Sequence, residues 1–173
     1  MTTRHEDATD NSERQALAQL QGIERMLARL EHAQNCDGGD DTAADGVCEL
    51  TDAEIAEGGD YFISSTYTIA DARRDYHDED KARESIEEDP LSVETRSGWH
   101  APGEHDEADE EYCILLCTGG PAVRIIGELD EDGEPTSARL QHQDWGTPWT
   151  EYITTGVDHQ ALLEYAAHFL GGF

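Results

Sequence analysis

An apolar stripe with helical spacing runs through the first part of the chain. Its members, at intervals of four, three, four and three residues, are Ala16, Leu20, Ile23, Leu27 and Leu30. This spacing puts all five side chains on one face of a helix of about 20 residues that begins near Ser12. A stripe this narrow suits the core of the same chain or the seam of a coiled coil, so a homodimer through residues 12–30 stays open.

Three short helices are predicted between this stripe and residue 90, over residues 52–57, 69–76 and 80–88. Thr51 and Glu54 have the spacing of a capping box at the start of the first. Pro90 ends the last, because proline cannot continue a helix. The β-branched and aromatic residues of 61–67 indicate a short strand.

The pattern changes from helical to alternating near Leu91. Residues 112–117 are predicted to be a central strand, and residues 122–128 and 137–143 a hairpin around the acidic turn 130–134. Asp158 is expected to cap a final helix that runs to Leu170. The fold class is therefore α+β: an antiparallel sheet of three to four strands with a covering C-terminal helix, preceded by an N-terminal helical segment.

These elements divide the chain into three parts. Residues 1–10 are expected to be a flexible tail, residues 11–89 an acidic and mainly helical segment, and residues 90–173 the sheet with its helix. No apolar stretch reaches the ~18 residues of a membrane span, and the first residues lack the apolar region of a signal peptide. A cytoplasmic protein is expected.

Charge changes this picture most: 40 acidic residues stand against 11 basic ones, a net charge of -29. So large an excess exceeds what solubility needs and disfavours direct binding to nucleic acid or anionic membranes. The acidic residues are grouped in bands along the sequence. The densest bands supply the candidate partner-binding residues: Asp75, Asp78, Glu79, Asp80, Glu84, Glu87, Glu88, Asp89, Glu104, Asp106, Glu107, Asp109, Glu110 and Glu111.

The acids of 78–89 and 104–111 fall at intervals close to the charge spacing of a phosphate strand. This favours a DNA-mimic inhibitor that occupies the groove of a basic DNA- or RNA-binding protein. Two alternatives stay open. Lys81 is the only lysine, which also suits a salt-adapted protein of unrelated function, and the histidines of the second half suit a small metal-dependent enzyme.

Cysteines and histidines give no complete site at this stage. Cys113 and Cys117, four residues apart on one strand, would lie roughly 13 Å apart, too far for one zinc ion. Cys36 and Cys48 lie in or beside a loop where His32 could join them. Idle thiols are the preferred interpretation, so no metal, cofactor or catalytic residue is predicted, and the protein is expected not to be an enzyme.

Tryptophan is scarce, and Trp145 and Trp149 lie in one aromatic and polar loop. They are candidate interface residues, since tryptophan is enriched at interface hot spots, with packing in the protein's own core as the alternative.

Three segments carry a resemblance to known proteins: Arg96-Ser97-Gly98-Trp99, Leu115-Leu116-Cys117-Thr118-Gly119-Gly120-Pro121 and Gln143-Asp144-Trp145-Gly146-Thr147-Pro148-Trp149. They resemble small proteins encoded on bacterial plasmids, prophages and integrative elements. The similarity covers about a third of the chain and supplies no catalytic residues. Such elements carry anti-restriction and anti-CRISPR genes, so the resemblance implies a CRISPR effector or restriction enzyme as the partner.

Overall fold

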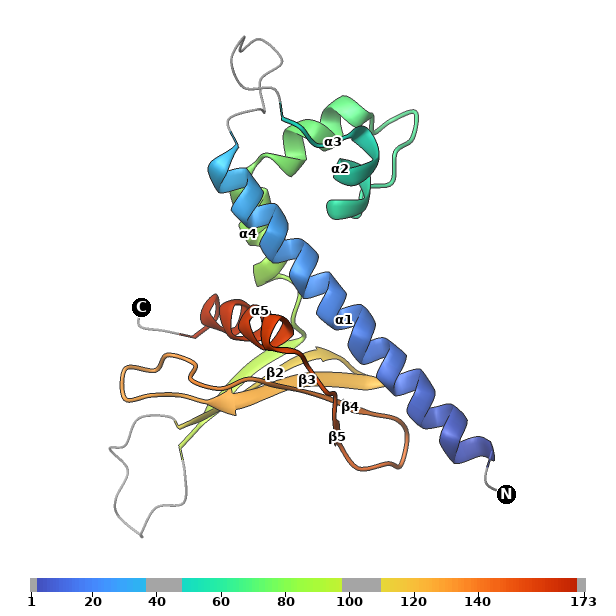
Figure 1. The fold of residues 1–173 in the computed structure, drawn as a ribbon, viewed down its shortest axis with the longest axis vertical. Coiled ribbons are helices and arrows are strands. Elements are labelled where there is room, and N and C mark those ends of the chain that lie inside the picture. Colours follow the sequence, from blue (N-terminus) through green and yellow to red (C-terminus); the bar gives the residue numbers. More distant parts are fainter. Residues whose placement is uncertain (1–2, 37–47, 98–109, 171–173) are drawn as a thin grey trace. The chain divides into compact units, whose positions relative to one another are not determined.

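A computed structural model describes residues 3–36, 48–97 and 110–170, with side chains from residue 11 onward. Within these ranges the chain is α+β, as predicted (Figure 1). No described helix combines the length and apolar character that crossing a membrane requires. The elements are α1 (Thr3–Asn35), α2 (Asp52–Gly58), α3 (Ile69–Tyr76), α4 (Glu79–Glu87), β1 (Ser92–Arg96), β2 (Glu111–Cys117), β3 (Ala122–Glu128), β4 (Arg139–Gln143), β5 (Thr150–Glu151) and α5 (Gly156–Ala167).

The chain forms two compact units. One contains the residues up to Ile23 together with those from Asp89 onward, and the other contains Glu24 to Glu88. In this division the second unit ends at Glu88, and the first half of α1 belongs with the sheet and not with the other helices.

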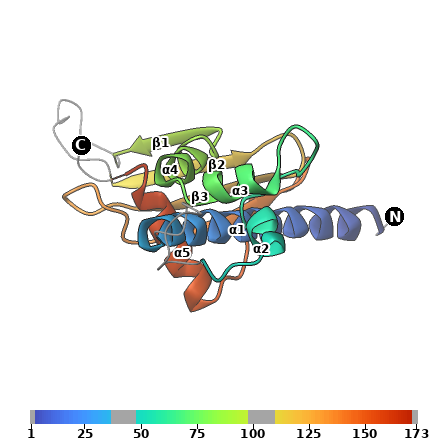
Figure 2. The same cartoon turned by 90° about the horizontal axis from the view of Figure 1, so that it is seen from above.

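The sheet has the strand order β1-β2-β3-β4-β5, and every pair is antiparallel (Figures 1 and 2). The two-residue β5 makes it one strand larger than the three to four expected. β2 pairs on both sides, as predicted for an internal strand. Burial alternates along β2 and β3, so one face of each strand enters the core. That face carries the buried side chains Tyr112, Ile114, Leu116, Val123 and Ile125.

Tyr112 and Gly127 form a tight pair across β2 and β3. The Tyr112 hydroxyl donates to the Ser137 carbonyl at 2.8 Å, so the ring lies across the glycine. A Cβ atom on Gly127 would come within 1.9 Å of that carbonyl and 2.5 Å of the ring. Only glycine fits this position.

α5 packs on the sheet with Leu162, Tyr165 and Ala166 buried. Thr155 caps it, and Asp158, which was expected as the cap, is instead the third helical residue of a capping box. The difference arises because the cap of a Thr-x-x-Asp box lies three residues before its acidic member, so the helix begins at Gly156. Tyr165 donates to the Asp89 carboxylate at 2.6 Å.

The second unit, Glu24 to Glu88, is the helical unit and is built around a small apolar cluster. Ile55 of α2 and Ala72 and Tyr76 of α3 form its buried centre. α2 and α3 begin with capping boxes at Thr51 and Thr68, and Asp78 caps α4. The expected strand over 61–67 is absent from this described stretch, which is irregular. Tyr61 and Tyr67 pack on the cluster instead of pairing with another strand, so their side chains serve a helical core.

The apolar stripe of α1 is buried throughout within the protein itself. Ala16 and Ile23 have no exposed surface, and Leu20, Leu27 and Leu30 are also buried. A homodimer through this stripe would require these side chains to leave the core. The helix begins at Thr3 and therefore runs through most of the segment expected as a tail. No glycine or proline lies between Thr3 and Asn11 to end it.

Asp89 gives a pH dependence that can be measured. Burial raises the pKa of its carboxyl, and the hydrogen bond from Tyr165 only partly opposes this. The pKa is higher in the folded state, so the associated stability is fully present below the unfolded value of about 3.9 and is lost as the pH rises through the folded value. Asp89→Asn keeps an acceptor for Tyr165 and removes the charge. We expect it to flatten the pH dependence of the free energy of unfolding above about pH 4.

Urea denaturation across this pH range measures the effect. Asp80→Asn is the matched control, because it removes one carboxylate that lies exposed to solvent. An Asp89→Asn variant with the slope of the parent would contradict the assignment.

Candidate functional site

The structure divides the predicted acidic residues into internal and exposed groups. Asp75 accepts from Lys81 at 2.6 Å and from Tyr67 at 3.0 Å, and its side chain is only 13% exposed. These contacts, with Arg74, hold the pKa of Asp75 below its usual value despite burial. Asp89 is bound to Tyr165. Asp75 and Asp89 therefore have structural partners and do not form part of an open acidic surface.

The exposed group lies on α4 and its C-terminal end. Glu79 is exposed and forms an ion pair with Arg83 at 2.8 Å. The other four carboxylates form no ion pair among the described residues, and they are Asp80, Glu84, Glu87 and Glu88. Ala82 and Ile86 lie buried on the opposite side of this helix. α4 is thus amphipathic, with a carboxylate row turned to solvent.

The second predicted band is only partly described. Glu104, Asp106, Glu107 and Asp109 lie outside the described residues, so their place in a partner-binding surface stays a prediction. Glu110 is exposed, and Glu111 of β2 pairs with Arg96 of β1.

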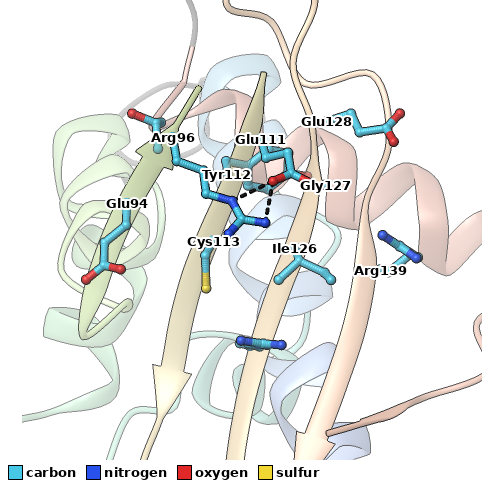
Figure 3. A pocket seen from close by; sticks show the side chains of 11 residues that line it. Glu94, Arg96, Glu111, Tyr112, Cys113, Ile126, Gly127, Glu128 and Arg139 are labelled. Atoms are coloured by element: carbon cyan, nitrogen blue, oxygen red, sulfur yellow. Dashed lines mark hydrogen bonds and ion pairs between the residues drawn. The ribbon is translucent and has the colours of Figure 1, made fainter. Parts of the chain in front are cut away.

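That ion pair lies on the open face of the sheet, over a shallow hollow of about 370 Å³ (Figure 3). Its rim mixes three carboxylates with three guanidinium groups: Glu94, Glu111, Glu128, Arg96, Arg124 and Arg139. Cys113 lies between them, and burial raises the pKa of its thiol. The positive and negative charges balance, so this face lacks the negative field of a DNA mimic. The Cys113 thiol is protonated, so it is not an activated nucleophile.

The two candidate tryptophans have different environments. Trp149 stacks on Arg124, with the guanidinium carbon 4.1 Å from the ring centre. Trp145 is 80% exposed and lies against Gly120, where a Cβ atom would meet the indole at 1.8 Å. Trp149 therefore stabilises the sheet, and Trp145 is the member of the pair available for an interface.

The described histidines of the second half, His142, His159 and His168, do not belong to a cluster of metal-ligating side chains. His142 accepts or donates at 2.8 Å with Ser12 and is buried, and His159 contacts the Ala138 carbonyl at 3.0 Å. His100 and His105 lie outside the described residues. Among the described residues, the one cluster of metal-ligating side chains lies elsewhere, in the helical unit.

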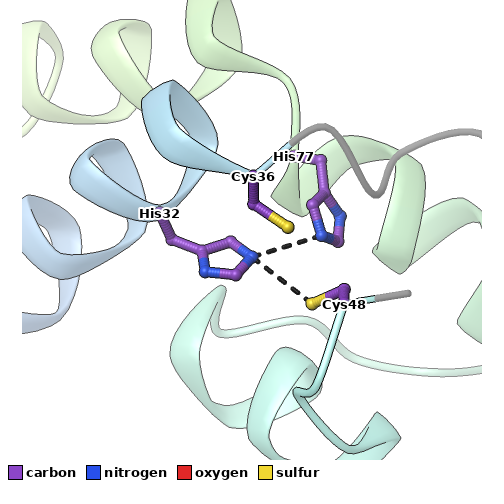
Figure 4. Close-up of side chains that lie close together, drawn as sticks. All are labelled: His32, Cys36, Cys48 and His77. Atoms are coloured by element: carbon purple, nitrogen blue, oxygen red, sulfur yellow. Dashed lines mark hydrogen bonds between the residues drawn. The ribbon is translucent and has the colours of Figure 1, made fainter. Parts of the chain in front are cut away.

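That cluster consists of His32, Cys36, Cys48 and His77 (Figure 4). The Nε2 atom of His32 lies 3.2 Å from Nε2 of His77 and 3.4 Å from Sγ of Cys48. All four potential ligand atoms lie within 4.8 Å of one another. Two nitrogens and two sulfurs thus converge on one point.

Local structure explains how each ligand reaches this point. His32 lies in the last turn of α1 and Cys36 directly follows the helix, and a separation of four residues places both on one face. Cys48 precedes α2, and His77 is the C-cap of α3. Arg73 ties these segments together through hydrogen bonds to the Leu50 carbonyl and to Asp52.

Burial shifts the pKa values of His32 and Cys48 in this cluster. Burial, and then the neighbouring His77, lower the pKa of His32, so its imidazole is neutral near pH 7. Burial raises the pKa of the Cys48 thiol, and a hydrogen bond from the backbone of Leu50 partly opposes this.

The structure brings together Cys36, Cys48 and His32, the three residues that the sequence placed in or beside one loop. His77 is the fourth member, and the spacing of residues in the sequence did not point to it.

Comparison of the chain with protein-family models, with curated proteins and with solved structures gives no match.

Proposed function

We propose that this protein is a cytoplasmic, non-enzymatic inhibitor that imitates DNA and occupies the groove of a basic DNA- or RNA-binding protein. Its partner is of the kind that restricts mobile elements, a CRISPR effector or restriction enzyme. The observation that carries the proposal is the carboxylate row on α4.

Four exposed acids without an ion pair among the described residues, from Asp80 to Glu88, span eight residue steps of this helix and its cap. At 1.5 Å per residue they cover about 12 Å, or one charge per about 4 Å. This is close to the axial charge spacing of about 3.4 Å along one DNA strand. The surrounding unit adds to the field, because residues 24–88 hold nineteen acidic and six basic residues.

Inhibition follows because the protein and DNA compete for the same basic side chains of the partner. Lysines and arginines that bind phosphates would bind the row instead, and the long-range field would accelerate the encounter. The exposed Trp145 lies in the other unit and supplies an apolar contact of the hot-spot type. Asp75, Asp89 and Glu111 are left out of the proposed surface because they have internal partners.

The test uses a matched pair of variants with the same change in net charge. One neutralises the row with Asp80→Asn, Glu84→Gln, Glu87→Gln and Glu88→Gln. The control neutralises four exposed acids in and beside the β3–β4 turn, namely Glu128, Glu131, Asp132 and Glu134. Displacement of labelled duplex DNA from purified restriction enzymes and CRISPR effectors is measured at several salt concentrations.

We expect the row variant to inhibit at least about tenfold more weakly, since four surface ion pairs at about 0.5 kcal/mol each are lost. The control should change inhibition by less than about threefold, and parent affinity should fall as salt rises. If both variants lose inhibition equally, inhibition depends on the net charge of the protein and not on the carboxylate row. Absence of DNA displacement at about 0.1 M salt would contradict mimicry, and unfolding of the parent at low salt would favour salt adaptation.

A further inference from the structure

We propose that His32, Cys36, Cys48 and His77 bind one Zn²⁺ ion and that this ion is a structural part of the helical unit.

The distances between the ligand atoms match the edges of a zinc tetrahedron. With Zn–N about 2.05 Å and Zn–S about 2.3 Å, tetrahedral angles give about 3.35 Å between two nitrogens and about 3.55 Å between nitrogen and sulfur. The corresponding atoms lie 3.2 Å and 3.4 Å apart. A hydrogen bond accounts for one of these two short distances. His32 Nε2, however, makes both of them, and the Sγ atom of Cys36 also lies within 4.8 Å.

The tautomer of His77 supports a metal ligand rather than a hydrogen-bond donor at Nε2. Its Nδ1 atom lies 2.6 Å from the Arg73 carbonyl, and a carbonyl can only accept, so Nδ1 carries the proton. In the neutral ring Nε2 then offers a lone pair towards the centre of the cluster. A backbone carbonyl that fixes the ring in this way is the usual outer partner of a zinc-bound histidine.

The donor set selects zinc from the common cations. No carboxylate belongs to the cluster, although the chain contains 40 acidic residues. Calcium and magnesium take oxygen ligands, whereas two sulfurs and two imidazole nitrogens suit Zn²⁺. Four protein ligands complete the tetrahedron and leave no position for water, which is the arrangement of a structural and not a catalytic site.

The apolar packing beside the four ligands is limited. The cluster around α2 and α3 has three buried members among the described residues, and the described cysteines form no disulfide. A small core of this kind gains stability from a metal that joins distant segments. The four ligands join the end of α1, the chain before α2 and the end of α3.

The full-length protein, purified without a histidine tag, provides the first test. Elemental analysis should find about one zinc per chain. Replacement by Co²⁺ should give the visible absorption of a tetrahedral site with thiolate ligands. A thiol reagent should label Cys36 and Cys48 much faster after chelation, which requires no mutation and so does not depend on a variant that folds.

Variants then locate the ion. Cys48→Ser and His77→Asn should each lower the zinc content at least tenfold at equal free zinc. Cys113→Ser and Cys117→Ser are matched controls in the sheet and should keep the zinc content of the parent.

Three results would overturn the proposal. One is a protein without zinc that takes up none from solution. Another is zinc that stays bound in the Cys48→Ser and His77→Asn variants. The third is a Cys36–Cys48 disulfide in protein kept under reducing conditions. None of these measurements depends on inhibition of a partner, so the zinc site and the proposed function are tested independently.

Discussion

Replacing Leu20 and Leu27 together by glutamate is expected to unfold the protein rather than to yield a folded monomer. The two side chains are 3% and 7% exposed. Each substitution loses about 1.5–3 kcal/mol of apolar burial and places a carboxylate in the core, which costs several kcal/mol more. The sum approaches the total stability of an ordinary domain. Circular dichroism and size-exclusion chromatography measure the outcome.

The single variants should act on different units, because Leu20 belongs to the unit with the sheet and Leu27 to the helical unit. Leu17→Glu is the matched control: Leu17 lies on the same helix but is 40% exposed, and we expect a change below about 1 kcal/mol. A double variant that is folded, monomeric and as stable as the parent would show that the stripe serves a dimer instead of the core.

A single methyl group at Gly127 is expected to cost about 3 kcal/mol of unfolding free energy, at the upper end of overpacking effects. The added Cβ atom of Gly127→Ala would overlap the Ser137 carbonyl and the Tyr112 ring. The carbonyl belongs to the backbone, so the strands must separate to relieve the overlap. The hydrogen bond of Tyr112 to this carbonyl would be lost with it.

Urea denaturation compares this variant with Gly156→Ala. A Cβ atom at Gly156 meets nothing within 4 Å, and the residue lies in the first turn of α5. That control should gain up to about 1 kcal/mol, since alanine restricts the unfolded chain. If Gly127→Ala were as stable as the parent, the close approach of Gly127 to Tyr112 and Ser137 would be wrong.

Sequence alone predicted the elements whose signals are local. Helix α3 covers the predicted residues 69–76, and β2 with the hairpin β3–β4 follows from alternation and turn residues. The five-residue stripe of α1 correctly marked a buried face. In each case neighbours in the sequence supply the stabilising contacts.

The remaining features depend on contacts between distant residues. The tyrosines of 61–67 have strand-like composition but pack on helices. Asp75 and Asp89 have the sequence context of surface charges, but in the structure they accept hydrogen bonds from Lys81 and Tyr165. His77 joins the cysteines from about 30 residues away, and the only local hint was the four-residue spacing of His32 and Cys36 at a helix end.

The buried phenol groups set an alkaline limit for the fold. Burial and the Asp75 carboxylate raise the pKa of Tyr67 to about 12, and burial raises the pKa of Tyr112 and of Tyr165 above its ordinary value. A pKa raised by folding means that the associated stability is intact below about pH 10 and disappears as the pH climbs past the folded values. Tyrosinate absorbance should therefore rise together with unfolding, so the protein carries its own optical indicator of denaturation by base.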